Sequence, residues 1–294
     1  MRKIQIVTDS ACDIPKELEE KYGIRILPFA IIVGDQSFTE RKDFTQDEFY
    51  QILTTSPKTP STAQYTAHQF SELYSELFSQ GVTDVIYVST NAKGSSTNAN
   101  AHLAKQQFFE EHPEAVGEME IYIVDSQTYS MGYGFPVIEA ARKARKGASP
   151  SEILAYLEDW FNCCRVIFAP YSLEFVRKSG RVSCAAAFVG ELMGFKPIIA
   201  FENGESVTIN KVRGEKAVIP ALLKKMQAEM IPHTPYIILE GSDPSVSDAM
   251  IAETEKLFGP PAGRVKIGAA ISINAGHRIL GVVYKCSIIC SNIY

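Results

Sequence analysis

A stretch rich in hydroxyl and amide side chains, residues 91–101, carries the residue types best suited to holding a ligand. It includes Ser95, Ser96 and Thr97, and it follows a short apolar run, residues 85–88, that is typical of a buried parallel strand. The first N–H groups of a helix are unpaired and attract anions, and serine and threonine hydroxyls add further donors. The stretch therefore predicts either an anion-binding turn or an ordinary Ser/Thr/Asn helix cap.

Two other predicted strands end in similar turns. Residues 8–10 follow the first strand, and residues 125–127 follow the strand at 121–124. Parallel strands bring their carboxyl ends to one edge of a sheet, where ligands bind in open α/β folds. The three turns together indicate a site at this edge, with Asp9 and Ser10 as candidate ligand-binding residues. Asp9 could equally cap the helix that follows it, and we favour the cap.

The sequence offers neutral donors without an evident reactive centre. It contains no Walker A, GxGxxG, GxSxG, HExxH or EF-hand pattern. No histidines have metal-ligand spacing, and no base is evident for a catalytic serine. We therefore expect no catalytic residues, no metal and no cofactor. Arg181 could bind an anion or a partner, or could equally be a solvated turn residue. His277 lies in a glycine-rich turn between two predicted strands.

Strands and helices alternate along residues 1–163, which predicts an α/β domain with a parallel sheet and helices on both faces. Asp13 is expected to cap the helix that follows it. The segment 57–67 is rich in Pro, Ser and Thr and is expected to be irregular. The strands are expected at residues 3–7, 26–33, 85–88 and 121–124.

Residues 164–294 mix hairpins and helices and are expected to form a second, α+β domain. Asn203-Gly204 predicts a hairpin turn between strands at residues 196–201 and 206–213. The other elements expected here are strands at 166–169, 236–240, 265–273 and 280–284, and helices at 173–178, 185–193, 217–230 and about 245–258, of which the one at 185–193 is expected to be tightly packed.

Composition argues against several classes of function. The net charge is −5, which gives no support for a nucleic-acid surface. No apolar stretch is long enough to span a bilayer, and the start lacks the features of a signal peptide. The six cysteines lack the paired spacing of a zinc site, and we interpret them as free thiols in a reducing cytosol. We therefore expect a cytoplasmic protein.

Several separated motifs, in order along nearly the whole chain, resemble those of the DegV family, bacterial proteins that bind a long-chain fatty acid. Residues 8–10 resemble the family's opening T-D-S, and residues 91–97 resemble S-S-K-L-S-G-T. Each motif alone is weak, but all of them in this order are specific. The other matching segments are Pro60-Ser61-Thr62-Ala63-Gln64 (T-S-Q or T-A-Q), Val124-Asp125-Ser126 with Gly132 and Gly134 (V-D-S, then S-x-G-x-G), and Gly180-Arg181-Val182-Ser183 with Lys196-Pro197-Ile198 (G-G-R-I-S and K-P-I).

The resemblance implies a two-domain DegV-type fold, in which an acyl chain lies between an N-terminal domain, residues 1–163, and a C-terminal domain, residues 164–294. In the family a Thr of the T-S-Q segment and the Ser of the S-G-T turn hold the carboxylate, and these positions fall on Thr62 and Ser95. The resemblance also implies a non-enzymatic carrier that presents the acid to a separate, ATP-binding subunit of a fatty acid kinase. From the pattern and the resemblance together, the ligand-binding candidates are Asp9, Ser10, Thr62, Gln64, Ser95, Ser96, Thr97, Arg181 and Asn274.

Three departures distinguish this chain from the family pattern. Ser96 stands where the family has a turn glycine. Residues 274–278 read Asn-Ala-Gly-His-Arg instead of H-x-G-P-G, so that Asn274 replaces the family's His, and residues 285–294 look unlike the family. These departures bear more on partnership with a kinase than on lipid binding. The expected lining of the lipid tunnel is Phe29, Ile31, Met193, Ile198 and Ala270.

Two other functions remain open from the sequence. The same strand-end donors could serve an enzyme or sensor for a small phosphorylated metabolite, which would need a short polar pocket. A structural module that only binds a protein partner would need no pocket. A long apolar tunnel would favour the lipid carrier over both.

Overall fold

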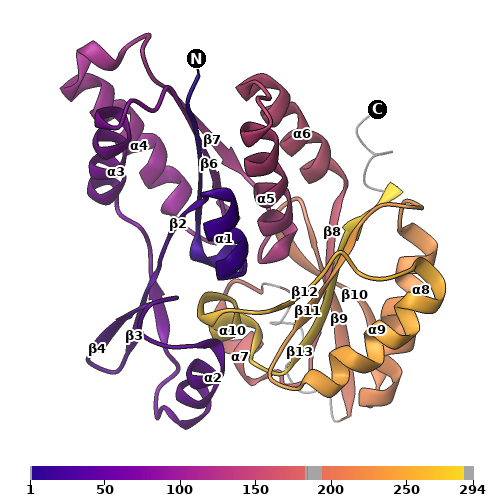
Figure 1. Cartoon of the computed structure of the whole chain (residues 1–294). Helices are drawn as coiled ribbons and strands as arrows, with labels where there is room; N and C mark the ends of the chain where they lie inside the picture. The colour runs from indigo at the N-terminus through magenta and orange to yellow at the C-terminus, as the bar shows by residue number, and fades with distance from the viewer. Residues whose placement is uncertain (1, 183, 185–193, 288–294) are drawn as a thin grey trace.

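The computed structural model describes residues 2–182, 184 and 194–287 (Figure 1). Its N-terminal half is built on a four-stranded parallel sheet in the order β2-β1-β6-β7, as the sequence predicts. All four strands run in one direction, so their carboxyl ends meet at one edge. Their bounds are β1 Ile4–Asp9, β2 Arg25–Leu27, β6 Asp84–Ser89 and β7 Glu120–Asp125.

Helices cover both faces of this sheet, which confirms the prediction. Successive side chains of a strand point to opposite faces. On β6, Val85 and Tyr87 pack against α3 and α4, whereas Ile86 and Val88 belong to the core on the opposite face, which includes α5 and α6. The helices of this half are α1 Lys16–Tyr22, α2 Gln46–Thr55, α3 Ala67–Ser79, α4 Thr97–Glu111, α5 Met131–Arg145 and α6 Pro150–Cys163, with short 3₁₀ turns at Ser10–Cys12 and Pro113–Ala115.

A small antiparallel sheet, in the order β4-β3-β5, projects beside the parallel one (Figure 1). The prediction of one strand over residues 26–33 is wrong, because the chain leaves the parallel sheet after Leu27 and enters the small sheet at Ala30. Pro28 lies at the break and has no N–H for a ladder. The prediction that residues 57–67 are irregular is also wrong in part. The three strands are β3 Ala30–Val33, β4 Gln36–Thr39 and β5 Ser61–Ala63.

The second half is built on a six-stranded mixed sheet in the order β10-β9-β8-β13-β11-β12. One face packs on α8 and α9, and the other faces the core that includes α5 and α6 (Figure 1). The predicted hairpin is confirmed, with Asn203 and Gly204 both at positive φ between its strands. The strands are β8 Cys164–Pro170, β9 Phe195–Glu202, β10 Glu205–Arg213, β11 Tyr236–Glu240, β12 Gly263–Lys266 and β13 Ile279–Lys285.

The expected strand at residues 265–273 is wrong, because β12 ends at Lys266 and a helix, α10 Ala269–Ala275, follows. Two distant carboxyl groups accept hydrogen bonds at the start of this helix. Asp13 accepts from the N–H of Gly268, and Glu40 accepts from that of Ala270, each at 2.8 Å. The prediction that Asp13 caps α1 is therefore wrong, because its carboxyl group accepts a hydrogen bond at the start of α10 instead. The other helices of this half are α7 Glu174–Ser179, α8 Val218–Glu229 and α9 Pro244–Phe258, with a 3₁₀ turn at Glu215–Ala217.

Three further predictions concern the cysteines, membrane-spanning helices and the helix at residues 185–193. Cys12, Cys164 and Cys184 carry free thiols, but Cys163 is disulfide-bonded, so the interpretation of all six as free thiols is wrong. Among the described residues no helix is both long and apolar enough to cross a bilayer. The helix expected at 185–193 lies outside the described residues.

Candidate functional site

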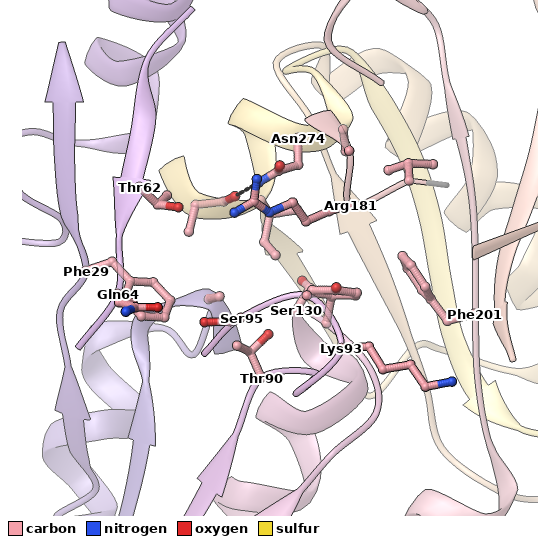
Figure 2. A pocket seen from close by; sticks show the side chains of 18 of the residues that line it. Phe29, Thr62, Gln64, Thr90, Lys93, Ser95, Ser130, Arg181, Phe201 and Asn274 are labelled. Carbon is pink, nitrogen blue, oxygen red and sulfur yellow. Dashed lines mark hydrogen bonds between the residues drawn. The ribbon is translucent and has the colours of Figure 1, made fainter. Parts of the chain in front are cut away.

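A cavity of about 770 Å³ lies between the carboxyl edge of the parallel sheet and the mixed sheet (Figure 2). Its N-terminal side includes β5 and the loop that joins β6 to α4, together with Ala11, Phe29, Tyr129 and Ser130. Its C-terminal side includes residues from β8, β9, β11, β13 and α10, together with residues 180–182. The cavity is thus placed where ligands bind in open α/β folds, at the ends of the strands.

Six of the nine candidate residues line this cavity. Figure 2 shows Thr62 and Ser95 on its N-terminal side and Arg181 and Asn274 on the opposite side. Gln64 follows Thr62 on the segment after β5. Residues far apart in the sequence therefore line one cavity. The six are Thr62, Gln64, Ser95, Ser96, Arg181 and Asn274.

The Ser95 hydroxyl takes part in the start of α4 and also lines the cavity. Its Oγ accepts the backbone N–H of Thr97 at 3.3 Å and lies 2.9 Å from the Thr97 hydroxyl. Thr97 itself is fully buried and is absent from the described lining. Ser96 precedes α4 but makes no side-chain cap. The capping and ligand-facing interpretations of this stretch are therefore compatible, because the same side chain satisfies both.

Asp9 lies away from the cavity and is surrounded by protein donors. It is fully buried and accepts hydrogen bonds from the hydroxyls of Tyr133 at 2.6 Å and Tyr87 at 3.2 Å. It also accepts the N–H groups of Thr90 and Ala11, the latter as a cap of the 3₁₀ turn. Burial raises the pKa of this carboxyl, and the four hydrogen bonds oppose that rise. Through these contacts the side chain of Asp9, at the end of β1, connects this strand to β6 and α5.

Ser10 also serves the protein's own structure. Its hydroxyl donates to Glu40 at 2.5 Å and accepts the N–H of Phe29 at 2.9 Å. Ser10 is buried and does not appear in the described lining of the cavity, although Phe29 does. The structure therefore does not bring Asp9 and Ser10 together with the other candidates.

Asn274 and Arg181 lie on the C-terminal side of the cavity. The amide nitrogen of Asn274 donates to the carbonyl of Ala270 at 2.8 Å, which leaves its oxygen and one amide hydrogen for other partners. Arg181 follows Gly180, whose φ of +64° ends α7 in the left-handed conformation. Figure 2 shows the guanidinium group of Arg181 beside Asn274, facing the side that carries Thr62. This group can offer positive charge to an anionic ligand.

The cavity is also lined by many apolar side chains. Phe29 and Ala270 line it as predicted, but Ile31 packs against α2 and α10 instead. Ile198 lies on the far face of the mixed sheet with α8, so its prediction is wrong, and Met193 lies outside the described residues. The apolar lining residues are Ala11, Phe29, Ala63, Ala92, Val166, Phe168, Val182, Phe201, Leu239, Ala270, Ile271, Ala275 and Ile279.

The sequence did not identify five polar lining residues, namely Thr66, Thr90, Lys93, Tyr129 and Ser130. Thr90 is buried, and its hydroxyl has no hydrogen-bond partner among the described residues. Ser130 donates to Asp13 at 2.5 Å. Thr90 directly follows β6, so its strand-end position was a usable signal. His277 lies 2.7 Å from the hydroxyl of Ser242 and is absent from the described lining.

Sequence comparison identifies relatives over most of the chain. The model of the DegV family of uncharacterised proteins matches residues 3–286. A DegV domain-containing protein of Clostridium perfringens is 27% identical over 285 residues, 96% of this chain and 98% of that protein. Another, from Caldanaerobacter subterraneus subsp. tengcongensis, is 33% identical over 227 residues, 77% of this chain and 78% of that protein.

Two solved structures have the same fold. A fatty-acid-binding DegV family protein from Thermus thermophilus matches with a TM-score of 0.86 and 27% identity, over 97% of this chain and 100% of that one. DegV from Bacillus subtilis, described as a fatty acid binding protein, matches with a TM-score of 0.81 and 25% identity, over 97% of this chain and 99% of that one. The motifs, the fold and the extent of the match agree, and the chain belongs to the DegV family.

Proposed function

We propose that this chain binds a long-chain fatty acid, with its carboxylate at Thr62 and Ser95 and its tail against the mixed sheet. The observation that carries the proposal is a single cavity whose lining combines a group of polar donors with many apolar side chains. An amphipathic ligand of one charged group and a long hydrocarbon chain matches this combination. Two relatives of the same fold, at 27% and 25% identity, are described as fatty-acid binding.

The polar lining residues supply donors that suit a carboxylate. The hydroxyl oxygens of Ser95 and Thr97 are 2.9 Å apart, so one of the two hydroxyls donates to the other. When Thr97 is the donor, the hydroxyl proton of Ser95 is free to point at the ligand. Thr62 offers a second hydroxyl from β5, and Arg181 adds positive charge. Hydrogen bonds to a carboxylate are charge-assisted and stronger than neutral ones. These groups would fix the position of the head group.

The apolar lining residues supply most of the affinity. Each methylene moved from water into an apolar site contributes about 0.8 kcal/mol. The cavity volume of about 770 Å³ lies within the range of about 300–1,000 Å³ that is usual for small-molecule sites. Side chains such as Phe168, Leu239 and Ile279 would surround the tail. A small phosphorylated metabolite, the alternative, would leave this apolar surface uncovered.

We assign the chain a carrier role in which a separate, ATP-binding kinase subunit acts on the presented acid. The described lining contains no carboxylate, histidine or cysteine that could act as a base or nucleophile there. The buried carboxyls Asp9, Asp13 and Glu40 are engaged by protein donors. We place the carrier in the cytoplasm, where a kinase subunit would find its ATP.

Titration calorimetry on delipidated protein tests the binding proposal. A long-chain fatty acid should bind tightly, and a short sugar phosphate should not bind. Ala270→Phe should fill the cavity and lower the fatty-acid affinity at least tenfold, whereas Ala155→Phe, at an exposed position of α6, should leave it unchanged. Binding of the sugar phosphate without binding of the fatty acid would establish the alternative instead.

A further inference from the structure

The position of Gly94 leaves no room for a side chain. It does not adopt a positive φ, so the backbone there would accept any L-residue. A Cβ built at Gly94 would lie 2.0 Å from the hydroxyl oxygen of Tyr129 and 3.2 Å from its Cζ. The phenol hydroxyl of Tyr129 therefore occupies the space beside the loop in which a side chain of residue 94 would lie.

A neighbouring amide fixes the direction of the hydrogen bond at this hydroxyl. The Asn91 amide nitrogen donates to the carbonyl of Gly204 at 2.7 Å. A carbonyl can only accept, so the nitrogen, and not the oxygen, of this amide must face that way. The same nitrogen lies 3.0 Å from the Tyr129 hydroxyl and donates to it. The phenol oxygen is thus the acceptor, and its own proton is left over.

Among the described residues, the Tyr129 hydroxyl donates no hydrogen bond, and the one it takes part in is the one it accepts from Asn91. Burial raises the pKa of the Tyr129 phenol, so the hydroxyl remains a donor at neutral pH. The ring is held in place by Phe201, whose centroid is 4.8 Å away. A fixed donor that lines the cavity and has no acceptor is an incomplete hydrogen bond, which a bound ligand can complete.

We propose that Tyr129 donates a hydrogen bond to the carboxylate of the bound fatty acid, as a third hydroxyl beside Thr62 and Ser95. The inference rests on the proposed function and extends it by one binding residue and the glycine that admits it. Tyr129, Gly94 and Ser95 all line the cavity, and Gly94 adjoins Ser95 in the chain. The backbone N–H of Gly94 also donates to the carbonyl of Asn91 at 3.0 Å, which forms a turn over residues 91–94. The loop and the tyrosine thus form one site.

A double-mutant cycle on Tyr129 and Gly94 tests the proposal. Tyr129→Phe removes the donor and should weaken fatty-acid binding about tenfold. Gly94→Ala should weaken binding by a similar factor, because the new Cβ displaces the hydroxyl. In the Tyr129→Phe background the 2.0 Å clash disappears and a contact of 3.2 Å to Cζ remains, so Gly94→Ala should then change the affinity less than about twofold.

Two controls separate head-group recognition from a structural effect. Tyr156→Phe removes a phenol hydroxyl on α6, which does not line the cavity, and should not change the affinity. A fatty alcohol of equal length lacks the charge, so Tyr129→Phe should weaken its binding less than threefold. Equal weakening of acid and alcohol, wild-type affinity in Tyr129→Phe, or additive losses in the double variant would each overturn the inference. Failure of the wild-type protein to bind fatty acid would instead refute the proposed function.

Discussion

The carboxyl group of Glu40 accepts a hydrogen bond of 2.8 Å from the backbone N–H of Ala270, 230 residues further along the chain. Its other oxygen accepts from Ser10, whose hydroxyl in turn accepts the N–H of Phe29. Phe29 lines the cavity from the N-terminal half, and Ala270 lines it from the C-terminal half. One buried carboxyl group therefore links two walls of the cavity, and its protonation bears on the stability of the fold.

Stability should depend on pH through Glu40 and Asp13. Burial raises the pKa of Asp13 to about 8 and that of Glu40 to about 7, although hydrogen bonds and Arg41 oppose the rise. The folded protein therefore keeps protons that the unfolded chain releases above about pH 4. The free energy of unfolding should fall between about pH 5 and about pH 8, by up to about 1.4 kcal/mol per pH unit for each proton.

Urea unfolding across this pH range measures the effect. Asp13→Asn keeps an acceptor for Gly268 and removes the ionisation, so it should flatten part of the slope. Exposed carboxyl groups such as Glu17 provide the control, and Glu17→Gln should leave the slope as it is. Stability that rises with pH over the same range would mean that both carboxyls are ionised in the folded protein.

Ser95→Ala should weaken fatty-acid binding about tenfold or more, because a charge-assisted hydrogen bond contributes roughly 1.5–3 kcal/mol. The double change with Thr62→Ala should cost less than the sum of the single changes, since both hydroxyls are proposed to hold one carboxylate. A fatty alcohol of equal length should respond little to either change. Calorimetric titration of each variant with both ligands measures this.

The same experiment distinguishes binding from capping at Ser95. Ser79→Ala, at the end of α3 and outside the described lining, serves as a matched control and should bind both ligands normally. If Ser95→Ala weakens the acid and the alcohol equally, the hydroxyl acts by shaping the start of α4.

Asp9→Ala should destabilise the protein by more than about 3 kcal/mol, because it leaves several buried donors without an acceptor, each at a cost of about 1–3 kcal/mol. The donors include the hydroxyls of Tyr87 and Tyr133 and the N–H of Thr90. Denaturant unfolding measures the loss. Asp9→Asn retains one acceptor oxygen and should cost less. If Asp9→Ala had normal stability but no longer bound fatty acid, Asp9 would be a ligand-binding residue.

The second glycine of the S-x-G-x-G motif should contribute to the stability of the fold. A Cβ at Gly134 would lie 2.2 Å from the backbone carbonyl oxygen of Cys12, which cannot move aside as a flexible side chain could. Gly134→Ala should therefore cost at least about 1–3 kcal/mol of stability. Gly263→Ala is the control, because its nearest neighbour, Ile237, is 3.8 Å away. Thermal unfolding of the two variants should differ clearly, and equal melting temperatures would contradict the packing argument.

The regular part of the fold follows from local pattern. Alternating strands and helices predicted the parallel sheet with both faces covered, and Asn203-Gly204 predicted the hairpin of the mixed sheet. The failures occurred where distant partners decide the conformation. The start of α10 depends on Asp13 and Glu40, which lie more than 200 positions away, and the sequence around residues 265–273 carries no trace of them.

The candidate site could be predicted where a motif and a strand end coincide. Ser95 is such a case, because it follows β6 and belongs to the segment 91–97, which resembles a motif of the DegV family. Thr62 could be assigned only through the resemblance, since spacing does not bring β5 to that loop. Tyr129 was missed because its position depends on the space left by Gly94, which is visible only in three dimensions. Ile198 was wrongly chosen because an apolar strand residue does not reveal which face of its sheet it occupies.

Native mass spectrometry of the protein purified from cells tests the central claim most directly. The intact protein should carry an additional mass equal to that of one long-chain fatty acid, and denaturation should release it. Delipidated protein should regain the same increment when a fatty acid is added, and Ala270→Phe should not, because its side chain fills the cavity. Protein that is isolated without this increment and does not acquire it from added fatty acid would contradict the account.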